Sequence, residues 1–251
     1  MIVFIFFIVL FFYILFLLLI CRVYAGYRKK KDAKRFSTEN NMVIKNTEQD
    51  VTQPYLQKSI IKNWISKIRG ISEPYLYGLV RYMSIWIGKI PSHRVRKFLL
   101  RNCLLMKIHP EAIIYGGFEV RSPWNIKLGR VVIGVGALLD GRNGIVMEDD
   151  VCLAQNVMIF TEQHDLNDEF FRCNDKGGMV NIKDHAWISS RSTILPRVTV
   201  GSGAVLACGA IATKDLEPYG VYAGIPAKKV SDRNNNLKYS LGKNNSFWHF
   251  Y

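Results

Sequence analysis

Charged side chains are missing from the first 21 residues of this 251-residue chain. Only Tyr13 in this segment is weakly polar, and about twenty helical residues rising 1.5 Å each span the roughly 30 Å hydrocarbon core of a membrane. A cleaved signal peptide is the weaker alternative, because it needs a basic start, a shorter apolar core and small residues before the cleavage site. Only Ala25-Gly26 offers such small residues. We therefore predict a transmembrane anchor over residues 1–21.

Cysteine is also scarce, and its pattern excludes two kinds of protein. The number of cysteines is odd, and no two of them form a Cys-x-x-Cys pair, which argues against a disulfide framework and against a thiolate zinc site. Such usage suits a reducing compartment. The five residues are Cys21, Cys103, Cys152, Cys173 and Cys208.

Acidic residues are few in the first part of the chain. Residues 22–106 contain eighteen Lys/Arg and five Asp/Glu, a net charge of +13, whereas residues 107–230 contain thirteen and fourteen, a net of −1. Nucleic acid could attract such a basic cluster, but its position directly after an apolar segment favours the anionic inner face of a membrane. We therefore expect a membrane partner and no nucleic acid.

The basic residues also predict an orientation. By the positive-inside rule they remain in the cytoplasm, which leaves a short N-terminus outside and the body of the protein on the cytoplasmic face of the inner membrane. Residues 22–71 are predicted to form a basic juxtamembrane segment and linker, with the polar stretch Ser37–Gln53 as the linker. A helical region is predicted over residues 72–106. One helix is expected to start at Ser72-Glu73-Pro74 and a second at Ser92, with Val95, Phe98, Leu99 and Cys103 on one face.

An apolar residue recurs at every sixth position through the second half of the chain. A strand repeats every two residues and a helix about every 3.6, so this period fits short strands joined by regular corners, with each turn of chain stacked on the last. Small residues such as Ala137, Ala186 and Ala204 fall four places on, where a corner is cramped. The two series are Ile133, Leu139, Ile145, Val151 and Val157, and then Ile182, Ile188, Ile194, Val200, Leu206 and Ala212.

The repeats define the remaining boundaries. Ile108, Ile114, Val120 and Ile126 extend the six-residue step backwards, so we predict a β-helix over residues 107–230 and a C-terminal tail over residues 231–251. The helical region is expected to cap the open first coil, whose edge would otherwise invite aggregation. The alternative is that its aromatic and basic side chains contact a membrane interface.

A polar insertion interrupts the repeats at residues 163–180 and contains His164. A loop on a rigid scaffold is a common position for catalytic groups. A histidine with an ordinary pKa near roughly 6.5 can take a proton from a hydroxyl group as that group attacks a carbonyl carbon. Asp165 is next to His164 in the sequence and could assist it in catalysis. A role as a polar residue of a turn is at least as plausible.

Four stretches carry the motifs of a known family. They are LLDGRNGI (138–145), FTEQHDLND (160–168), AWISSRSTILPRVTVGSGAVLACGAIATKDL (186–216) and VYAGIPAKKV (221–230). In these stretches the chain resembles the hexapeptide-repeat acyltransferases, which fold as a left-handed parallel β-helix. It is similar to maltose/galactoside O-acetyltransferases and closer to acetyltransferases of bacterial exopolysaccharide and capsule synthesis.

The resemblance implies an activity and a site. It implies an acetyl-CoA-dependent O-acetyltransferase that modifies a sugar hydroxyl in cell-surface polysaccharide synthesis, assembled as a homotrimer with active sites between neighbouring β-helices. His164 matches the catalytic histidine, and Cys208 stands where the family often has alanine, so it contributes through its backbone. The residues that match positions around acetyl-CoA are Trp187, Ser190 (through its backbone amide), Cys208, Thr213, Lys214 and Lys228.

Three other functions would also fit a β-helix of this kind. A γ-type carbonic anhydrase shares the β-helix but needs three histidines on zinc, and the five histidines here lack the required close pair, so no metal site is predicted. N-acetylation of a nucleotide-linked amino sugar is the enzymatic alternative. A non-catalytic membrane-bound β-helix scaffold is the alternative from another class.

Overall fold

The computed structural model describes the backbone of residues 2–45, 60–173 and 177–241, and the side chains of residues 4–37, 70–173 and 177–241. The chain divides into two compact units, residues 1–80 and residues 81–251, which are treated separately below. The first contains helix α1 (Ile2–Lys45) and most of helix α2 (Ile60–Gly88). The second contains the end of α2, helix α3 (His93–Asn102) and the repeats.

Helix α1 contains a segment long and apolar enough to cross a membrane. This segment is Phe4–Ser37, where the most apolar stretch has a mean hydropathy of 3.3 and only 11% of that stretch is buried. Farther along, Arg28 and Lys31 form ion pairs of 2.8 and 3.0 Å with Glu73 of α2. The apolar length expected at residues 1–21 is therefore present, as the first half of a longer helix.

Two boundaries predicted in this region are wrong. The linker expected from Ser37 is helical as far as Lys45, because residues 37–45 contain no proline or glycine to stop a growing helix; the rest of the predicted linker, up to residue 53, lies outside the described residues. The helix expected to begin at Ser72 begins at Ile60 and runs through Pro74. The proline removes one hydrogen bond, to the carbonyl of Gly70, without ending the helix.

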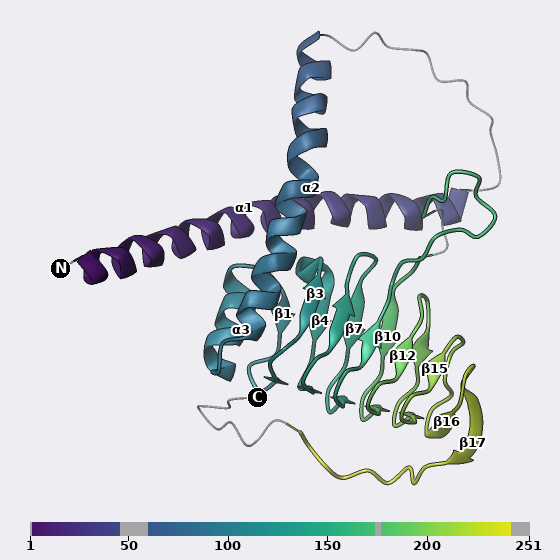
Figure 1. Cartoon of the computed structure of the whole chain (residues 1–251). Helices are drawn as coiled ribbons and strands as arrows, with labels where there is room; N and C mark the ends of the chain where they lie inside the picture. Colours follow the sequence, from purple (N-terminus) through teal and green to yellow (C-terminus); the bar gives the residue numbers. More distant parts are fainter. Residues whose placement is uncertain (1, 46–59, 174–176, 242–251) are drawn as a thin grey trace. The chain divides into compact units, whose positions relative to one another are not determined.

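Short parallel strands form three sheets that wind into a β-helix, which confirms the predicted fold (Figure 1). Each coil contributes one strand to each sheet, termed sheets A, B and C. Sheet A consists of β1 (Lys107–Ile108), β4 (Ile126–Leu128), β7 (Ile145–Met147), β10 (Val180–Ile182) and β13 (Thr199–Val200). Sheet B consists of β2 (Ile113–Ile114), β5 (Val132–Ile133), β8 (Cys152–Leu153), β11 (Trp187–Ile188), β14 (Val205–Leu206), β16 (Gly220–Ala223) and the antiparallel β17 (Lys228–Asp232). Sheet C consists of β3 (Glu119–Arg121), β6 (Leu138–Asp140), β9 (Met158–Ile159), β12 (Thr193–Ile194) and β15 (Ile211–Ala212).

Stacked aliphatic side chains fill the interior of the coils. In sheet B, Ile133 pairs in register with Leu153, Leu153 with Ile188, and Ile188 with Leu206, and each of these side chains is at most 1% exposed. Full burial of such a side chain contributes about 1.5–3 kcal/mol. All residues of the two predicted series are buried, so the six-residue period identified the core.

The phase of one coil differs from the prediction. Ile145 begins β7, and Val151 and Val157 are buried just before β8 and β9, whereas the residues in register with Ile182, Ile188 and Ile194 are Met147, Leu153 and Ile159. The shift of two residues follows the corner between Asp140 and Ile145, where Gly144 has a φ of +98° and its N–H donates to Gly141 O. After the insertion the predicted phase is correct, with Ile182, Ile188 and Ile194 as the inward-facing last residues of β10, β11 and β12.

Helix α3 caps the first coil, as predicted, but through an unexpected face. Val95 and Phe98 are 41% and 61% exposed, whereas Arg96 is 1% exposed. The Arg96 guanidinium donates to Ile114 O at 2.9 and 3.2 Å and also to Ile90 O. The carbonyl groups of the first coil have no preceding coil to donate hydrogen bonds to them. An arginine can supply these donors and an aliphatic side chain cannot.

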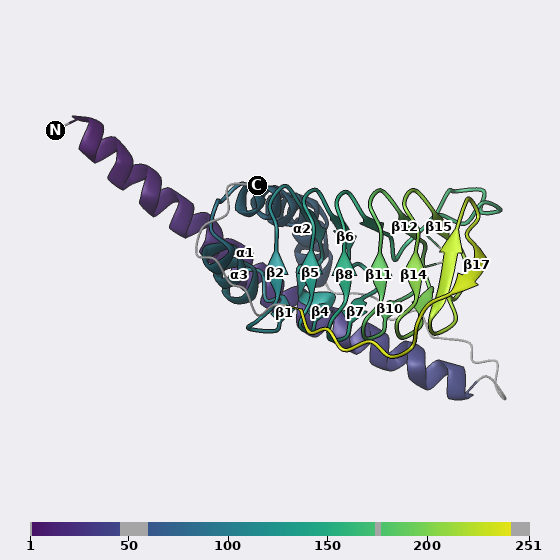
Figure 2. The ribbon, with the colours of Figure 1, turned by 90° about the horizontal axis from the view of Figure 1, so that it is seen from below.

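The start of the C-terminal tail lies along the corners between sheets A and B (Figure 2). Arg233 Nη1 and the Tyr239 hydroxyl both donate to His185 O at 3.0 Å, and the Leu241 N–H donates to Asp150 Oδ1 at 2.6 Å. The tail was predicted to begin at residue 231, but β17 continues to Asp232. The first residues of the tail are thus hydrogen-bonded to the corners of two successive coils, at Asp150 and at His185.

Candidate functional site

The insertion that carries His164 leaves the β-helix at the corner between sheets C and A, after β9, and returns at β10. The Thr161 carbonyl closes its base by accepting hydrogen bonds from Gly178 N–H at 2.8 Å and from Asn143 Nδ2 at 2.7 Å. A Cβ on Gly177 would lie 2.9 Å from that carbonyl, so only glycine fits this close approach. Both ends of the loop are therefore anchored to one corner.

Two backbone and ring contacts orient the imidazole of His164. Nδ1 lies 2.6 Å from Phe171 O, and the ring stacks on that of Phe171 with centroids 3.9 Å apart and planes at 8°. A carbonyl only accepts, so Nδ1 carries the proton, and in a neutral ring Nε2 is then the basic nitrogen. In the described part of the chain, Nε2 has no hydrogen-bond partner. His164 is exposed, so a substrate hydroxyl can reach it.

Asp165 has a structural role within the loop. Its side chain accepts a hydrogen bond from Asn167 N–H at 3.1 Å, and its backbone N–H donates to Arg172 O at 2.9 Å. These contacts form an Asx turn and close the tip of the loop. The turn explanation for this residue is therefore the better one.

Ser190 and Cys208 occupy equivalent positions at the corner between sheets B and C. Arg191 N–H donates to Gln155 O, and Gly209 N–H donates to Ser190 O, which stacks Gln155, Ser190 and Cys208 in successive coils. Among the hydrogen bonds of the described residues, none uses the N–H groups of these three. The corner thus presents a column of N–H donors that can bind carbonyl or oxyanion groups.

Trp187 lies between Cys152 and Val205 on the outer face of sheet B and is 44% exposed. Lys228 begins β17, opposite Ala223 at the end of that sheet. Thr213 and Lys214 follow β15 at the corner between sheets C and A, and all three of Thr213, Lys214 and Lys228 are exposed. The two-residue strand β15 is all that separates the Cys208 corner from Thr213 in the last complete coil.

The two lysines at positions 228 and 229 differ in their partners. Lys229 lies 2.8 Å from Asp232 and 3.0 Å from Glu217, and these hydrogen-bonded carboxylates raise its pKa. Lys228 and Lys214 form no ion pair with any described residue. They are therefore better placed than Lys229 to bind a phosphate group.

The structure does not bring all predicted site residues together within one chain. Sheet C lies between the corner that carries the loop and the corner that carries Ser190 and Cys208. No contact joins His164 to Trp187, Ser190 or Lys214 across the described ranges. His185, a second histidine within the repeats, lies at a third corner, with Nδ1 3.0 Å from Asp184 and Nε2 3.2 Å from Tyr239 O, so both of its nitrogens are occupied.

Residues that the sequence did not reveal surround His164. Phe171 and Cys173 contact its ring directly, and Glu162 and Arg142 lie at the base of the loop. No spacing in the sequence signals these contacts, because they depend on how an irregular loop folds.

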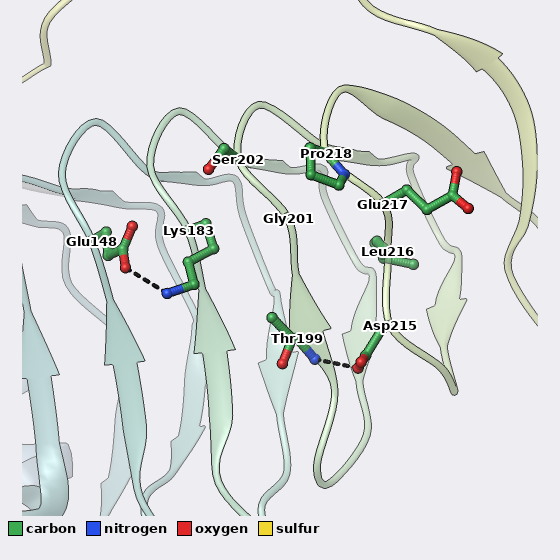
Figure 3. Close-up of a pocket in the computed structure, with 9 residues that line it drawn as sticks. All are labelled: Glu148, Lys183, Thr199, Gly201, Ser202, Asp215, Leu216, Glu217 and Pro218. Carbon is green, nitrogen blue, oxygen red and sulfur yellow. Dashed lines mark hydrogen bonds and ion pairs between the residues drawn. The ribbon is translucent and has the colours of Figure 1, made fainter.

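A groove at the far edge of sheet A does not suit phosphate groups (Figure 3). Glu148, Asp215 and Glu217 line it, and its single lysine, Lys183, lies 2.7 Å from Glu148. Asp215 accepts from Thr199 N–H at 2.7 Å. None of the predicted site residues lines this groove.

A parallel β-helix of six-residue repeats with a histidine loop inserted between two coils defines a recognisable class of protein. No family model matches the chain. A candidate acetyltransferase of Staphylococcus aureus is 32% identical over 124 residues, 48% of this chain and 61% of that protein. The chloramphenicol acetyltransferase of Klebsiella aerogenes is 35% identical over 75 residues, 30% of this chain and 36% of that protein. The chain spans about three fifths of the length of the curated relatives it matches first.

Solved structures share the fold. A hexapeptide-repeat acetyltransferase of Vibrio cholerae complexed with acetyl-CoA aligns with a TM-score of 0.55 at 18% identity, covering 73% of this chain and 94% of that one. A galactoside acetyltransferase in complex with coenzyme A aligns with a TM-score of 0.55 at 23% identity, covering 65% and 86%. The chain is thus similar in sequence to acetyltransferases over about half of its length, and it shares the fold of the hexapeptide-repeat acetyltransferases.

Proposed function

We propose that this protein transfers the acetyl group of acetyl-CoA to a sugar hydroxyl, in the synthesis of a cell-surface polysaccharide such as capsule, exopolysaccharide or O-antigen. The observation that carries the proposal is the orientation of His164, whose Nδ1–H is held by Phe171 O so that Nε2 is the proton acceptor. The names of the sequence relatives support acetyl transfer. A maltose O-acetyltransferase of Clostridium difficile with the same fold, aligned with a TM-score of 0.50, supports a hydroxyl acceptor.

The reaction follows from these groups. Nε2 takes the proton of the sugar hydroxyl as its oxygen attacks the thioester carbonyl carbon. A backbone N–H of the Ser190 corner stabilises the oxyanion that forms. When the C–S bond breaks, CoA leaves as a thiolate and takes the proton from the imidazolium. The products are the acetyl ester and CoA, and His164 is returned to its starting state.

The cofactor contacts are assigned by the same proposal. Acetyl-CoA extends from the N–H donors of Ser190 and Cys208, past Trp187, toward the exposed cations of Lys214 and Lys228. Thr213 adds a hydroxyl group near the phosphates. Lysine binds phosphate as a point charge, which fits two exposed lysines without acidic partners.

A site built from two copies of the chain accounts for the separation of His164 from Ser190. The outward row of sheet B is apolar from β2 to β14, with Ile113, Val132, Cys152, Trp187 and Val205, whereas that of sheet A is mostly polar, with Lys107, Lys127, Val146, Asn181 and Thr199. The loop also exposes Leu166 at 93% and Phe170 at 72%. These apolar groups support a homotrimer in which the loop of one copy completes the site of its neighbour.

The apolar segment of α1 is proposed to anchor the protein in the inner membrane, with the repeats in the cytoplasm. Arg22, Arg28 and Lys31 follow the apolar residues directly, which supports this orientation. Protease added outside intact cells should then leave the repeats uncut.

Acetyl transfer by the full chain in detergent micelles tests the proposed function. Sugars with only hydroxyl groups and matched amino sugars are compared as acceptors, with free CoA as the measured product. The proposal predicts turnover with hydroxyl acceptors. Turnover only with the amino sugars would assign N-acetylation instead. If calorimetry detects no binding of acetyl-CoA, the non-catalytic scaffold is favoured.

A further inference from the structure

Six side chains of alternating charge run along sheet C to the base of the His164 loop. Arg81 Nε and Arg121 Nε each lie 2.7 Å from Glu119 Oε1. Arg121 Nη1 then lies 3.8 Å and Arg142 Nη2 2.6 Å from Asp140 Oδ2, and Arg142 Nε lies 3.1 Å from Glu162 Oε2. The charge ladder, as we term this set, consists of Arg81, Glu119, Arg121, Asp140, Arg142 and Glu162.

The middle of the charge ladder is rigid. The Asp140 side chain is completely buried, and Arg142 grips it with Nε and Nη2 at 2.6 to 3.1 Å. Thr161 donates its hydroxyl proton to Asp140 O at 2.6 Å. A buried carboxylate strongly favours a paired arginine, so Arg142 has one well-defined position from which to reach Glu162.

The far end of the charge ladder reaches the imidazole. Cys173 Sγ lies 3.5 Å from His164 Nδ1, and the Glu162 carboxylate is close enough to the same thiol to raise its pKa. Burial and the nearby Glu162 charge raise the pKa of the Cys173 thiol, which therefore keeps its proton. If that proton points to Glu162, the sulfur lone pairs face Nδ1–H, and both Phe171 O and Cys173 favour the tautomer with a basic Nε2.

The charge ladder stops where the loop begins. The outward residues of the next strands in sheet C are Thr193 on β12 and Ile211 on β15. The last member, Glu162, lies directly before the insertion, so the charge ladder ends at the base of the loop that carries His164.

We propose that Arg142 and Glu162 are positioning residues for His164, which they hold through Cys173 in the geometry and tautomer needed for proton transfer. This inference rests on the proposed function, because it assumes that His164 is the base. Misplacing a reacting group by about 1 Å can cost up to roughly 100-fold in rate. Loss of the Glu162 link should therefore lower the rate of transfer without weakening the binding of acetyl-CoA.

The test uses the full chain in detergent micelles, with kcat, the KM for acetyl-CoA and the melting temperature measured for each variant. Glu162→Gln keeps the shape and removes the charge. Glu169→Gln is the matched control, since Glu169 is exposed in the same loop and forms no ion pair with a described residue. Glu162→Gln should lower kcat by roughly 10-fold or more, with KM within about twofold and an unchanged melting temperature. Glu169→Gln should leave kcat unchanged.

A double-mutant cycle separates positioning from general damage. In the His164→Ala background, Glu162→Gln should cause no further loss, because the residue acts only through His164. An equal loss with and without His164, or a kcat for Glu162→Gln equal to that of Glu169→Gln, would overturn the positioning role alone. A normal rate for His164→Ala by itself would overturn the proposed base, and this inference with it.

Discussion

The coils before the histidine loop are irregular, whereas the coils after it are regular. The later coils keep a strict six-residue step, with interior side chains such as Ile188 and small corner residues such as Ala204, both fully buried. The earlier coils contain a 3-10 turn at Pro123–Asn125, a two-residue shift of phase, and the charge ladder. The regular coils present backbone N–H groups at equivalent corner positions, as at Ser190 and Cys208. The irregular coils hold particular side chains in fixed positions, and the histidine loop is anchored to these coils.

Ile188→Asp should have the largest effect, because the regular half depends on its apolar interior. The change buries an unpaired carboxylate where the side chain is 0% exposed, at a cost of several kcal/mol, and the β-helix should unfold. Circular dichroism measures the loss. The control is Asn181→Asp on the outer face of β10, which should remain folded, and an Ile188→Asp protein with normal structure would contradict the description of the interior.

Arg96→Met should have the next largest effect, and it tests the capped end of the irregular half. The change removes the arginine donor from the carbonyls of Ile114 and Ile90 and leaves His93 Nδ1, 2.9 Å from Ile114 O, as a partner at the first of them, at a cost of about 1–3 kcal/mol in stability. Denaturant unfolding monitored by circular dichroism gives the difference. Arg101→Met, on the exposed side of α3, should be neutral, and equal losses in the two variants would show that the arginine is not the cap.

Lys214→Ala tests whether the regular half binds the cofactor. Removing one phosphate contact should raise the KM for acetyl-CoA by roughly 10-fold, which corresponds to about 1.4 kcal/mol, with little change in kcat. Lys229→Ala is the matched control, because Lys229 is already paired with Glu217 and Asp232. The assignment fails if the two variants have the same KM.

Acid should release the C-terminal tail, the smallest of these effects. Burial alone would raise the pKa of Asp150, but hydrogen bonds from Arg130 and from Leu241 N–H outweigh it and lower that pKa. A depressed folded-state pKa stabilises the attached tail above the unfolded value of about 3.9, and this stability is lost as the pH falls through the folded-state pKa. The protection factor of the Leu241 N–H against hydrogen exchange should therefore fall below about pH 4. Unchanged protection there would refute the role of Asp150.

The same contrast explains what the sequence could and could not predict. The period of six identified the main interior series of the later coils, because each of these residues points inward in a regular coil, but it did not include the buried Val180, Val198 and Leu216. The phase of Met147 and Leu153 was missed, since an insertion near Asn143 shifts it without changing which residues are apolar. The buried Arg96 was missed because charge predicts exposure unless carbonyl acceptors are known.

The site divides in the same way. The sequence motifs proposed His164, Ser190 and Cys208 through their resemblance to a known family, and their roles remain predictions. Phe171, Cys173 and Glu162 could not be predicted, because contacts within an irregular loop have no period. The start of α2 was predicted wrongly because Pro74 was placed in the first turn of a helix. The helix instead continues through Pro74, since the loss of one backbone hydrogen bond does not end it.

The most direct test of the account is the rate of acetyl transfer by His164→Ala, measured in the full chain together with acetyl-CoA affinity and circular dichroism. His164 is exposed and lies outside the interior series, so its removal should leave the fold and the affinity nearly unchanged. Loss of a positioned base should lower kcat by roughly 10²–10⁴-fold. A folded His164→Ala protein that turns over at the wild-type rate would contradict the assignment of the base.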